Sequence, residues 1–165
     1  MPLQPTVKDL VQFVTTALEY ELLSLSEVVA WGDNVIASQD VPPTWALDLA
    51  MAPDLLAVGE ILRQMEWLPG SCTRLMNERL LLGLLRRCWI NSIVDSEKAK
   101  STLGQMQLHY NDHQAYGEFV DIEAVRRLLF REYLEDFPHC DDVPWQLGQI
   151  FASCQSLDEL LPDWI

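Results

Sequence analysis

The stretch Leu-Leu-Leu-Gly-Leu-Leu, residues 80–85, decides the fold class. In a helix, its side chains are apolar on almost every side, with Gly83 as the only interruption. The apolar pattern continues in both directions and predicts a helix over about residues 72–94, capped by Ser71. A helix that is apolar all round is buried and has neighbours on several faces. We therefore expect this helix to be central in the fold.

Capping signals predict where other helices begin. Thr6, followed three residues later by an acid, fits an N-cap. Two Ser-x-x-Glu sequences, starting at Ser24 and at Ser156, fit capping boxes whose reciprocal hydrogen bonds open a helix. Asp121 fits the cap of an amphipathic helix that reaches about residue 137.

Prolines separate these helices, and Pro43 and Pro53 each suit the first residue of a new one. No segment alternates apolar and polar residues beyond a few positions, so we expect no strands. The fold class is all-α: a single-domain irregular bundle, residues 1–165, of about eight helices around the central one. The other predicted helices cover about residues 6–18, 24–36, 43–50, 53–65, 96–108, 122–137 and 144–154, with a last turn from 156.

The net charge of −14 is unevenly placed along the chain. Residues 1–62 carry one base and nine acids, a net of −8, and residues 63–131 carry ten bases and eight acids, a net of +2. Residues 132–165 carry eight acids and no base, a net of −8. Such a field repels nucleic acid and anionic membranes and attracts a basic partner. Acidity that serves only to keep the protein soluble is the alternative.

Two features indicate a cytoplasmic protein. The beginning, Met1 to Pro5, lacks the basic and apolar regions of a signal peptide, and no apolar run is long enough to cross a membrane.

The four cysteines lie at long, irregular intervals without a C-x-x-C pair, so we expect reduced thiols rather than a zinc or disulfide framework. These cysteines are Cys72, Cys88, Cys140 and Cys154.

The sequence His-Tyr-Asn-Asp-His, residues 109–113, is the strongest hint of a metal site. His109 and His113 have the i, i+4 spacing that places two imidazoles on one helix face, as in many zinc sites. Asn111 and Asp112 favour a turn, however, which would take the two rings off a common face. We therefore expect no metal and no cofactor, and keep a site at His109 and His113 as the alternative.

Motifs of common enzyme classes are missing from the sequence. We find no nucleophile elbow, no phosphate-binding loop, no dinucleotide fingerprint and no pair of carboxylates that stands out as an acid–base dyad. This favours a non-enzymatic protein.

One segment carries a resemblance. The sequence Glu-Val-Val-Ala-Trp-Gly-Asp, residues 27–33, is followed by Pro-Pro-Thr-Trp-Ala-Leu-Asp-Leu-Ala, residues 42–50. It resembles a recurring pattern in small bacterial proteins of unassigned function, in which a tryptophan-bearing helix precedes a proline pair and a short apolar helix. Small, acidic, helical proteins of this kind are similar in character to the immunity proteins of bacterial toxin systems. The resemblance covers about 25 residues and assigns no role to any of them.

These observations favour a binding protein that recognises, and in the immunity-type case inhibits, a basic protein partner such as a toxin. Acidic residues would steer association, and exposed tryptophans would anchor it. We expect the contact in residues 132–165. The candidate partner-binding residues are Glu135, Asp136, Asp141, Asp142, Trp145, Asp158, Asp163 and Trp164.

Two alternatives from other classes stay open. The first is a helical metal-binding or enzymatic domain that uses His109 and His113. The second is a structural or scaffolding subunit that forms a homodimer through its tryptophans, six of which occur in the chain. We expect a monomer or a homodimer, with no nucleic acid and no membrane among its partners.

Overall fold

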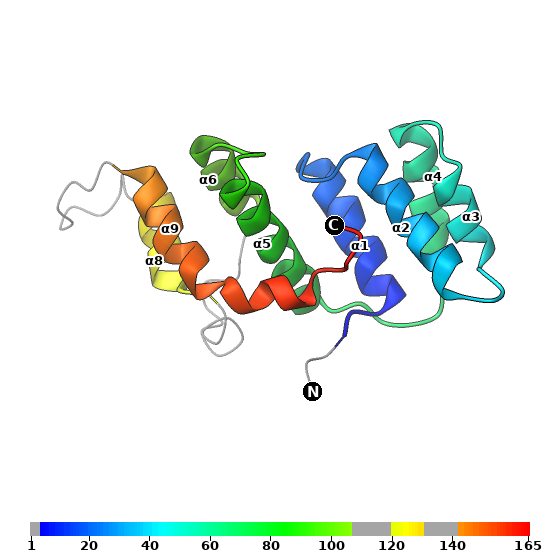
Figure 1. The fold of residues 1–165 in the computed structure, drawn as a ribbon. Helices are drawn as coiled ribbons and strands as arrows, with labels where there is room; N and C mark the ends of the chain where they lie inside the picture. The colour runs from blue at the N-terminus through cyan, green and yellow to red at the C-terminus, as the bar shows by residue number, and fades with distance from the viewer. Residues whose placement is uncertain (1–3, 107–119, 131–141) are drawn as a thin grey trace. The chain divides into compact units, whose positions relative to one another are not determined.

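The computed structural model of the protein describes residues 4–106, 120–130 and 142–165. Within these residues the chain forms nine helices and no strand, which confirms the all-α prediction (Figure 1). None of the described helices has both the length and the apolar character needed to cross a membrane. The helices are α1 (Val7–Glu19), α2 (Leu25–Ser38), α3 (Thr44–Ala50), α4 (Leu55–Met65), α5 (Arg74–Ile90), α6 (Ser96–Gln105), α8 (Ile122–Phe130), α9 (Val143–Ser153) and the 3-10 helix η2 (Gln155–Leu160).

The chain divides into two compact units. The first unit comprises Met1–Asn77 with Pro162–Ile165, and the second comprises Glu78–Leu161. Helices α1 to α4 belong to the first unit, and α6, α8, α9 and η2 belong to the second. The expectation of one domain over residues 1–165 stays a prediction.

Helix α5 contains the leucine stretch, and this stretch is buried as predicted. The five leucines between residues 80 and 85 are each at most 2% exposed. Gly83 has a structural role, because a Cβ there would lie 3.1 Å from the carbonyl oxygen of Leu157. The absence of a side chain at this position lets α5 approach η2 closely.

The start of α5 differs from the prediction. The helix begins at Arg74, and Ser71 is not its cap. The Thr73 hydroxyl accepts a hydrogen bond from the Met76 N–H at 3.2 Å, and the Thr73 N–H donates to a carboxylate oxygen of Asp9 at 3.0 Å. The position of the helix start therefore depends on a residue 64 positions earlier in the chain, which local sequence signals do not report.

One of the two predicted capping boxes is confirmed and the other is wrong. Both reciprocal bonds are present at Ser24 with Glu27, and also at Thr6 with Asp9, where an N-cap was predicted. At Ser156, by contrast, the chain passes directly from the end of α9 at Cys154 into η2, with no side-chain cap. A cap requires an extended residue before the helix, and Cys154 has φ −90° and ψ 6° instead.

Other boundaries shift by one or two residues. Pro43 is the N-cap of α3 rather than its first residue. Asp54, not Pro53, precedes α4, and its carboxylate accepts from the Ala57 N–H at 2.9 Å. Asp121 accepts from the Ala124 N–H at 3.0 Å, as predicted for the cap of α8. The predicted extensions of helices over 107–108 and 131–137 lie outside the described residues.

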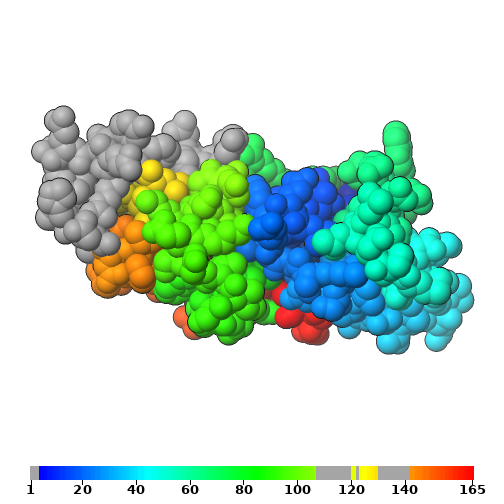
Figure 2. All heavy atoms as spheres, turned by 90° about the horizontal axis from the view of Figure 1, so that it is seen from above, coloured from blue at the N-terminus to red at the C-terminus, as the bar shows by residue number. Residues whose placement is uncertain are grey.

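The first unit is built around the crossing of α2 and α3. Trp31 of α2 is 2% exposed, and its ring packs against Trp45 of α3 and stacks on Trp164, with ring centroids 5.4 and 5.6 Å away. The red C-terminal residues lie against the blue helices of this unit (Figure 2). Gly32 lies next to Trp31, and a Cβ on it would come within 2.7 Å of the Ala50 nitrogen and 2.8 Å of the Ala46 oxygen.

We predict that Gly32→Ala destabilises the protein. The added methyl meets backbone atoms of α3 that no rotamer change can move, so the two helices must separate. The expected loss in the free energy of unfolding is about 1–3 kcal/mol, the usual cost of overpacking. Chemical denaturation measures it.

Gly59→Ala is the matched control, because it makes the same change in α4 where a Cβ would have no atom within 4 Å. Alanine favours a helix over glycine, so this variant should gain about 0.5–1 kcal/mol. Equal effects of the two substitutions would contradict the packing described for Gly32.

Candidate functional site

The predicted partner-binding residues fall into three groups. Glu135, Asp136 and Asp141 lie outside the described residues, as do the histidines of the alternative metal site, His109 and His113. Within the described residues, no three His, Cys, Asp or Glu side chains gather to hold a metal ion.

The second group lies in the second unit and has structural tasks. Asp142 is the N-cap of α9, and its carboxylate accepts from the Trp145 N–H at 3.2 Å. Asp158 forms an ion pair with Arg86, whose Nε also donates to the Phe151 carbonyl oxygen at 3.0 Å. This pair ties η2 to α5, so Asp158 has an internal partner for its charge.

The third group lies in the first unit. Asp163 is exposed, and Trp164 is partly buried by its stack on Trp31. Asp142, Trp145 and Asp158 therefore belong to the second unit, whereas Asp163 and Trp164 belong to the first, and their joint role in binding stays a prediction.

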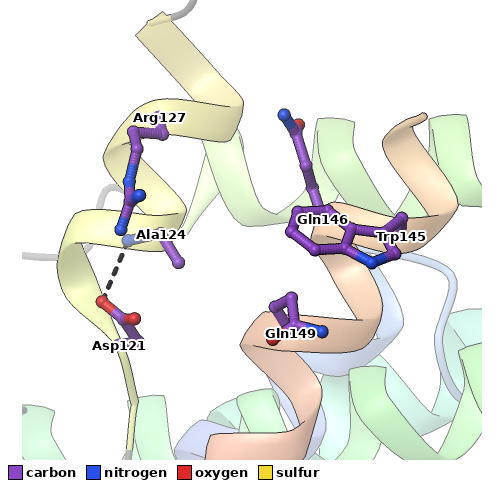
Figure 3. Close-up of a pocket in the computed structure, with 6 residues that line it drawn as sticks. All are labelled: Asp121, Ala124, Arg127, Trp145, Gln146 and Gln149. Atoms are coloured by element: carbon purple, nitrogen blue, oxygen red, sulfur yellow. Dashed lines mark hydrogen bonds between the residues drawn. The ribbon is translucent and has the colours of Figure 1, made fainter. Parts of the chain in front are cut away.

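A small pocket opens between α8 and α9. Its cavity volume is about 170 Å³, and Figure 3 shows its lining: Asp121, Ala124 and Arg127 from the α8 side, and Trp145, Gln146 and Gln149 from α9. The Arg127 side chain runs along α8, where its Nε donates to the Glu123 carbonyl at 3.2 Å. Trp145 is 56% exposed beside the pocket.

This pocket offers little for catalysis. Its described lining contains an aromatic ring, two amides and one guanidinium, and its carboxylate, Asp121, is occupied as the cap of α8. Sites for drug-sized ligands are larger, about 300–1,000 Å³. Trp145, a predicted anchor for a partner, is an exposed part of this lining.

Exposed apolar side chains are concentrated in the first unit, between residues 41 and 67. Of the ten large exposed apolar residues among those described, six lie in this stretch. They are Val41 at 84%, Leu47 at 41%, Met51 at 74%, Leu55 at 53%, Leu56 at 74% and Trp67 at 90% exposed.

Four of these residues form what we call the α3–α4 surface: Leu47, Met51, Leu55 and Leu56. Leu47 and Met51 are four positions apart and so share one face at the end of α3, while the two leucines begin α4 beyond the short turn. The buried face of α3 presents Ala46 and Leu49. Leu47 and Asp48, which lie between these two buried residues in the sequence, are exposed.

A groove lies beside this surface, between α1 and α4. Its volume is about 430 Å³. Gly59 leaves it open, because a Cβ there would touch nothing within 4 Å. We call it the α1–α4 groove, and Leu55 belongs to both the groove and the α3–α4 surface. The lining residues are Thr15, Leu18, Glu19, Leu55, Gly59, Leu62, Arg63 and Glu66.

Acidic side chains surround both features. Residues 40–67 contain five acids, all exposed, and one base, Arg63. Asp54 caps α4, whereas Asp48, Glu60 and Glu66 form no ion pair within the described residues. Exposed apolar side chains and acids without an internal ion pair therefore occur together in this part of the first unit.

None of these exposed apolar residues was predicted as a binding residue. Trp67, which is 90% exposed and lies outside the α3–α4 surface, follows the end of α4 and lies off the buried stripe of Val58, Leu62 and Met65. Its position outside the apolar periodicity of α4 is a sequence signal that could have predicted its exposure. The exposure of Leu47 and Met51 was not predictable in this way, because it depends on which face of α3 meets α2.

Comparison of the chain with protein-family models, with curated proteins and with solved structures finds no match to any of them.

We predict that Asp158→Asn destabilises the second unit. The substitution leaves the Arg86 guanidinium, whose side chain is 14% exposed, without its carboxylate. Because Asp158 is itself 35% exposed and water screens the pair, we expect a loss of about 1–2 kcal/mol in the free energy of unfolding. Asp163→Asn, which removes the same charge from an exposed position, should change it by less than about 0.5 kcal/mol. Equal losses would show that Asp158 has no structural role.

A second prediction concerns pH. Burial raises the pKa of the Cys154 thiol from 9.0 to about 12, with a smaller contribution from Asp158 against the lowering effects of Ser153 and Arg86. The folded state thus keeps a proton that the unfolded chain releases, so the stabilisation is complete below pH 9 and is lost as the pH rises toward 12. The expected slope is on the order of 1 kcal/mol per pH unit.

Urea titrations at several alkaline pH values measure this slope. Cys154→Ala should flatten it, whereas Cys72→Ala, at an exposed thiol, should leave it unchanged. The same slope in both variants would exclude the buried thiol as its cause.

Proposed function

We propose that the chain is a non-enzymatic binding protein that recognises a basic protein partner. The observation that carries the proposal is the α3–α4 surface, where Leu47, Met51, Leu55 and Leu56 are 41–74% exposed among acidic side chains. Apolar groups removed from water on association would supply most of the retained affinity. The acids would raise the rate of encounter and reject acidic proteins.

The negative net charge of the first unit supports a positively charged partner. Residues 1–77 and 162–165 contain eleven acids and three bases, a net of −8. The three bases are Lys8, Arg63 and Arg74, and Lys8 donates to the Leu68 carbonyl at 3.3 Å. An anionic surface of this kind repels nucleic acid and acidic membranes.

The finer part of the proposal is an immunity-type role in the cytoplasm of a bacterium. An acidic binder that covers a basic toxin can block its access to an anionic substrate such as nucleic acid. The resemblance of residues 27–50 to small acidic helical bacterial proteins supports this version. The α8–α9 pocket, with no catalytic constellation in its described lining, is consistent with a binder.

Affinity capture with the purified chain as bait tests the proposal. We expect a basic protein that is recovered at low salt, depleted at higher salt, and bound again when both proteins are purified and mixed. Steered association between opposite charges has this salt dependence. If the reconstituted partner is acidic, or if binding does not change with salt, the proposed recognition of a basic protein is wrong.

A further inference from the structure

We propose that the α1–α4 groove and the adjoining α3–α4 surface dock a cationic amphipathic helix of the partner, with one apolar side chain inserted beside Gly59. This inference rests on the proposed function and assigns the site and the recognised element. It involves only residues of the first unit.

The groove has the shape that such an anchor requires. Leu18 and Leu62 give it an apolar lining, and Leu62 is only 3% exposed, so the leucine lies at the floor. Gly59 contributes no side chain, and the space above its Cα is open. A volume of about 430 Å³ admits a leucine or phenylalanine side chain from another protein.

The neighbouring surface suits a helix rather than a single inserted residue. Amphipathic helices bind grooves through apolar anchors at i, i+3, i+4 and i+7, which need a continuous apolar track. Leu55 lines the groove and is 53% exposed, and Leu56 and Met51 follow it toward α3 with 74% exposed each. These three side chains therefore flank the α3–α4 turn, which lies at the top of these helices in Figure 1.

Charge complementarity identifies the occupant. Glu19 and Glu66 line the groove, and Glu60 and Asp48 are exposed on α4 and α3. Lysines or arginines on the flanks of a docked helix would meet these acids. A second copy of this chain would bring the same acids against one another, so self-association through this surface is disfavoured.

Arg63 is the exception, because it is the one base among the described residues that line the groove. Its charge opposes a cationic helix, and its removal should strengthen binding. A site whose occupant were acidic would behave in the opposite way, so this residue tests the sign of the occupant.

The test uses two synthetic peptides of about 18 residues, long enough to form a helix on binding. One has leucines on one face and lysines on the other, and the second has glutamates in place of the lysines. Fluorescence anisotropy with the full chain measures both affinities at low salt. We expect the lysine peptide to bind and the glutamate peptide not to bind.

Gly59→Leu is the decisive variant. It fills the groove at a position where the added side chain meets no atom near the Cβ and where leucine favours the helix more than glycine does. Thermal denaturation should show unchanged or greater stability, while affinity for the lysine peptide falls about tenfold. Gly104→Ala, a glycine replacement in α6 of the second unit, should leave the affinity unchanged.

Charge variants of the protein test whether the docked helix is positively charged. Asp48→Asn with Glu60→Gln should weaken binding by about threefold, and Arg63→Gln should strengthen it by about twofold. The matched control, Glu97→Gln with Glu159→Gln, makes the same change in net charge in the second unit and should have no comparable effect.

The outcomes separate the two proposals. If Gly59→Leu binds the lysine peptide as well as the parent chain does, the groove is not the site, although recognition of a basic partner stands. If Arg63→Gln weakens binding, the assignment of a cationic occupant to the groove is wrong. If the parent chain binds neither peptide, the groove does not dock a cationic helix, whereas the proposed function is overturned only by the outcome of the affinity capture.

Discussion

The close approach of α2 and α3 at Gly32 is the constraint on which the first unit depends. A helix of seven residues is too short to be stable alone, so α3 exists because it packs on something. The packing is possible because no Cβ stands between Gly32 and the backbone of Ala46 and Ala50. The ring of Trp31 packs against the ring of Trp45 and adds a second contact between the same two helices. One missing methyl group thus fixes the orientation of α3.

That orientation decides what the protein presents to solvent. With Ala46 and Leu49 turned to the core, the opposite face of α3 carries Leu47 and Asp48 outward. The turn after α3 then brings Leu55 and Leu56 into the same region and places α4 beside α1, where the groove forms. The exposed apolar surface is therefore a consequence of the way α3 packs on α2.

The sequence predicts features that depend on neighbours along the chain and misses those that depend on distant residues. Burial of the leucines in α5 follows from their composition alone, and the capping box at Ser24 follows from a spacing of three residues. The start of α5 does not, because Asp9 holds the N–H of Thr73 from far away in the sequence. The candidate surface belongs to the second kind, since the exposure of Met51 depends on which side of α3 meets α2.

The charges of the chain are also incompletely predicted from the sequence, because the sequence does not show which acids are paired in the fold. By sequence, Asp158 belongs to an acidic terminal segment that should attract a basic partner, yet in the fold its carboxylate pairs with Arg86 from 72 residues away. Asp48 and Glu60 have no such partner within the described residues. An acid that already neutralises an internal cation adds little to the attraction of another protein, whereas an exposed acid beside apolar groups adds to it in full. The folded position of each acid, more than the number of acids along the chain, therefore decides where the proposed basic partner would be attracted, and it favours α3 and α4.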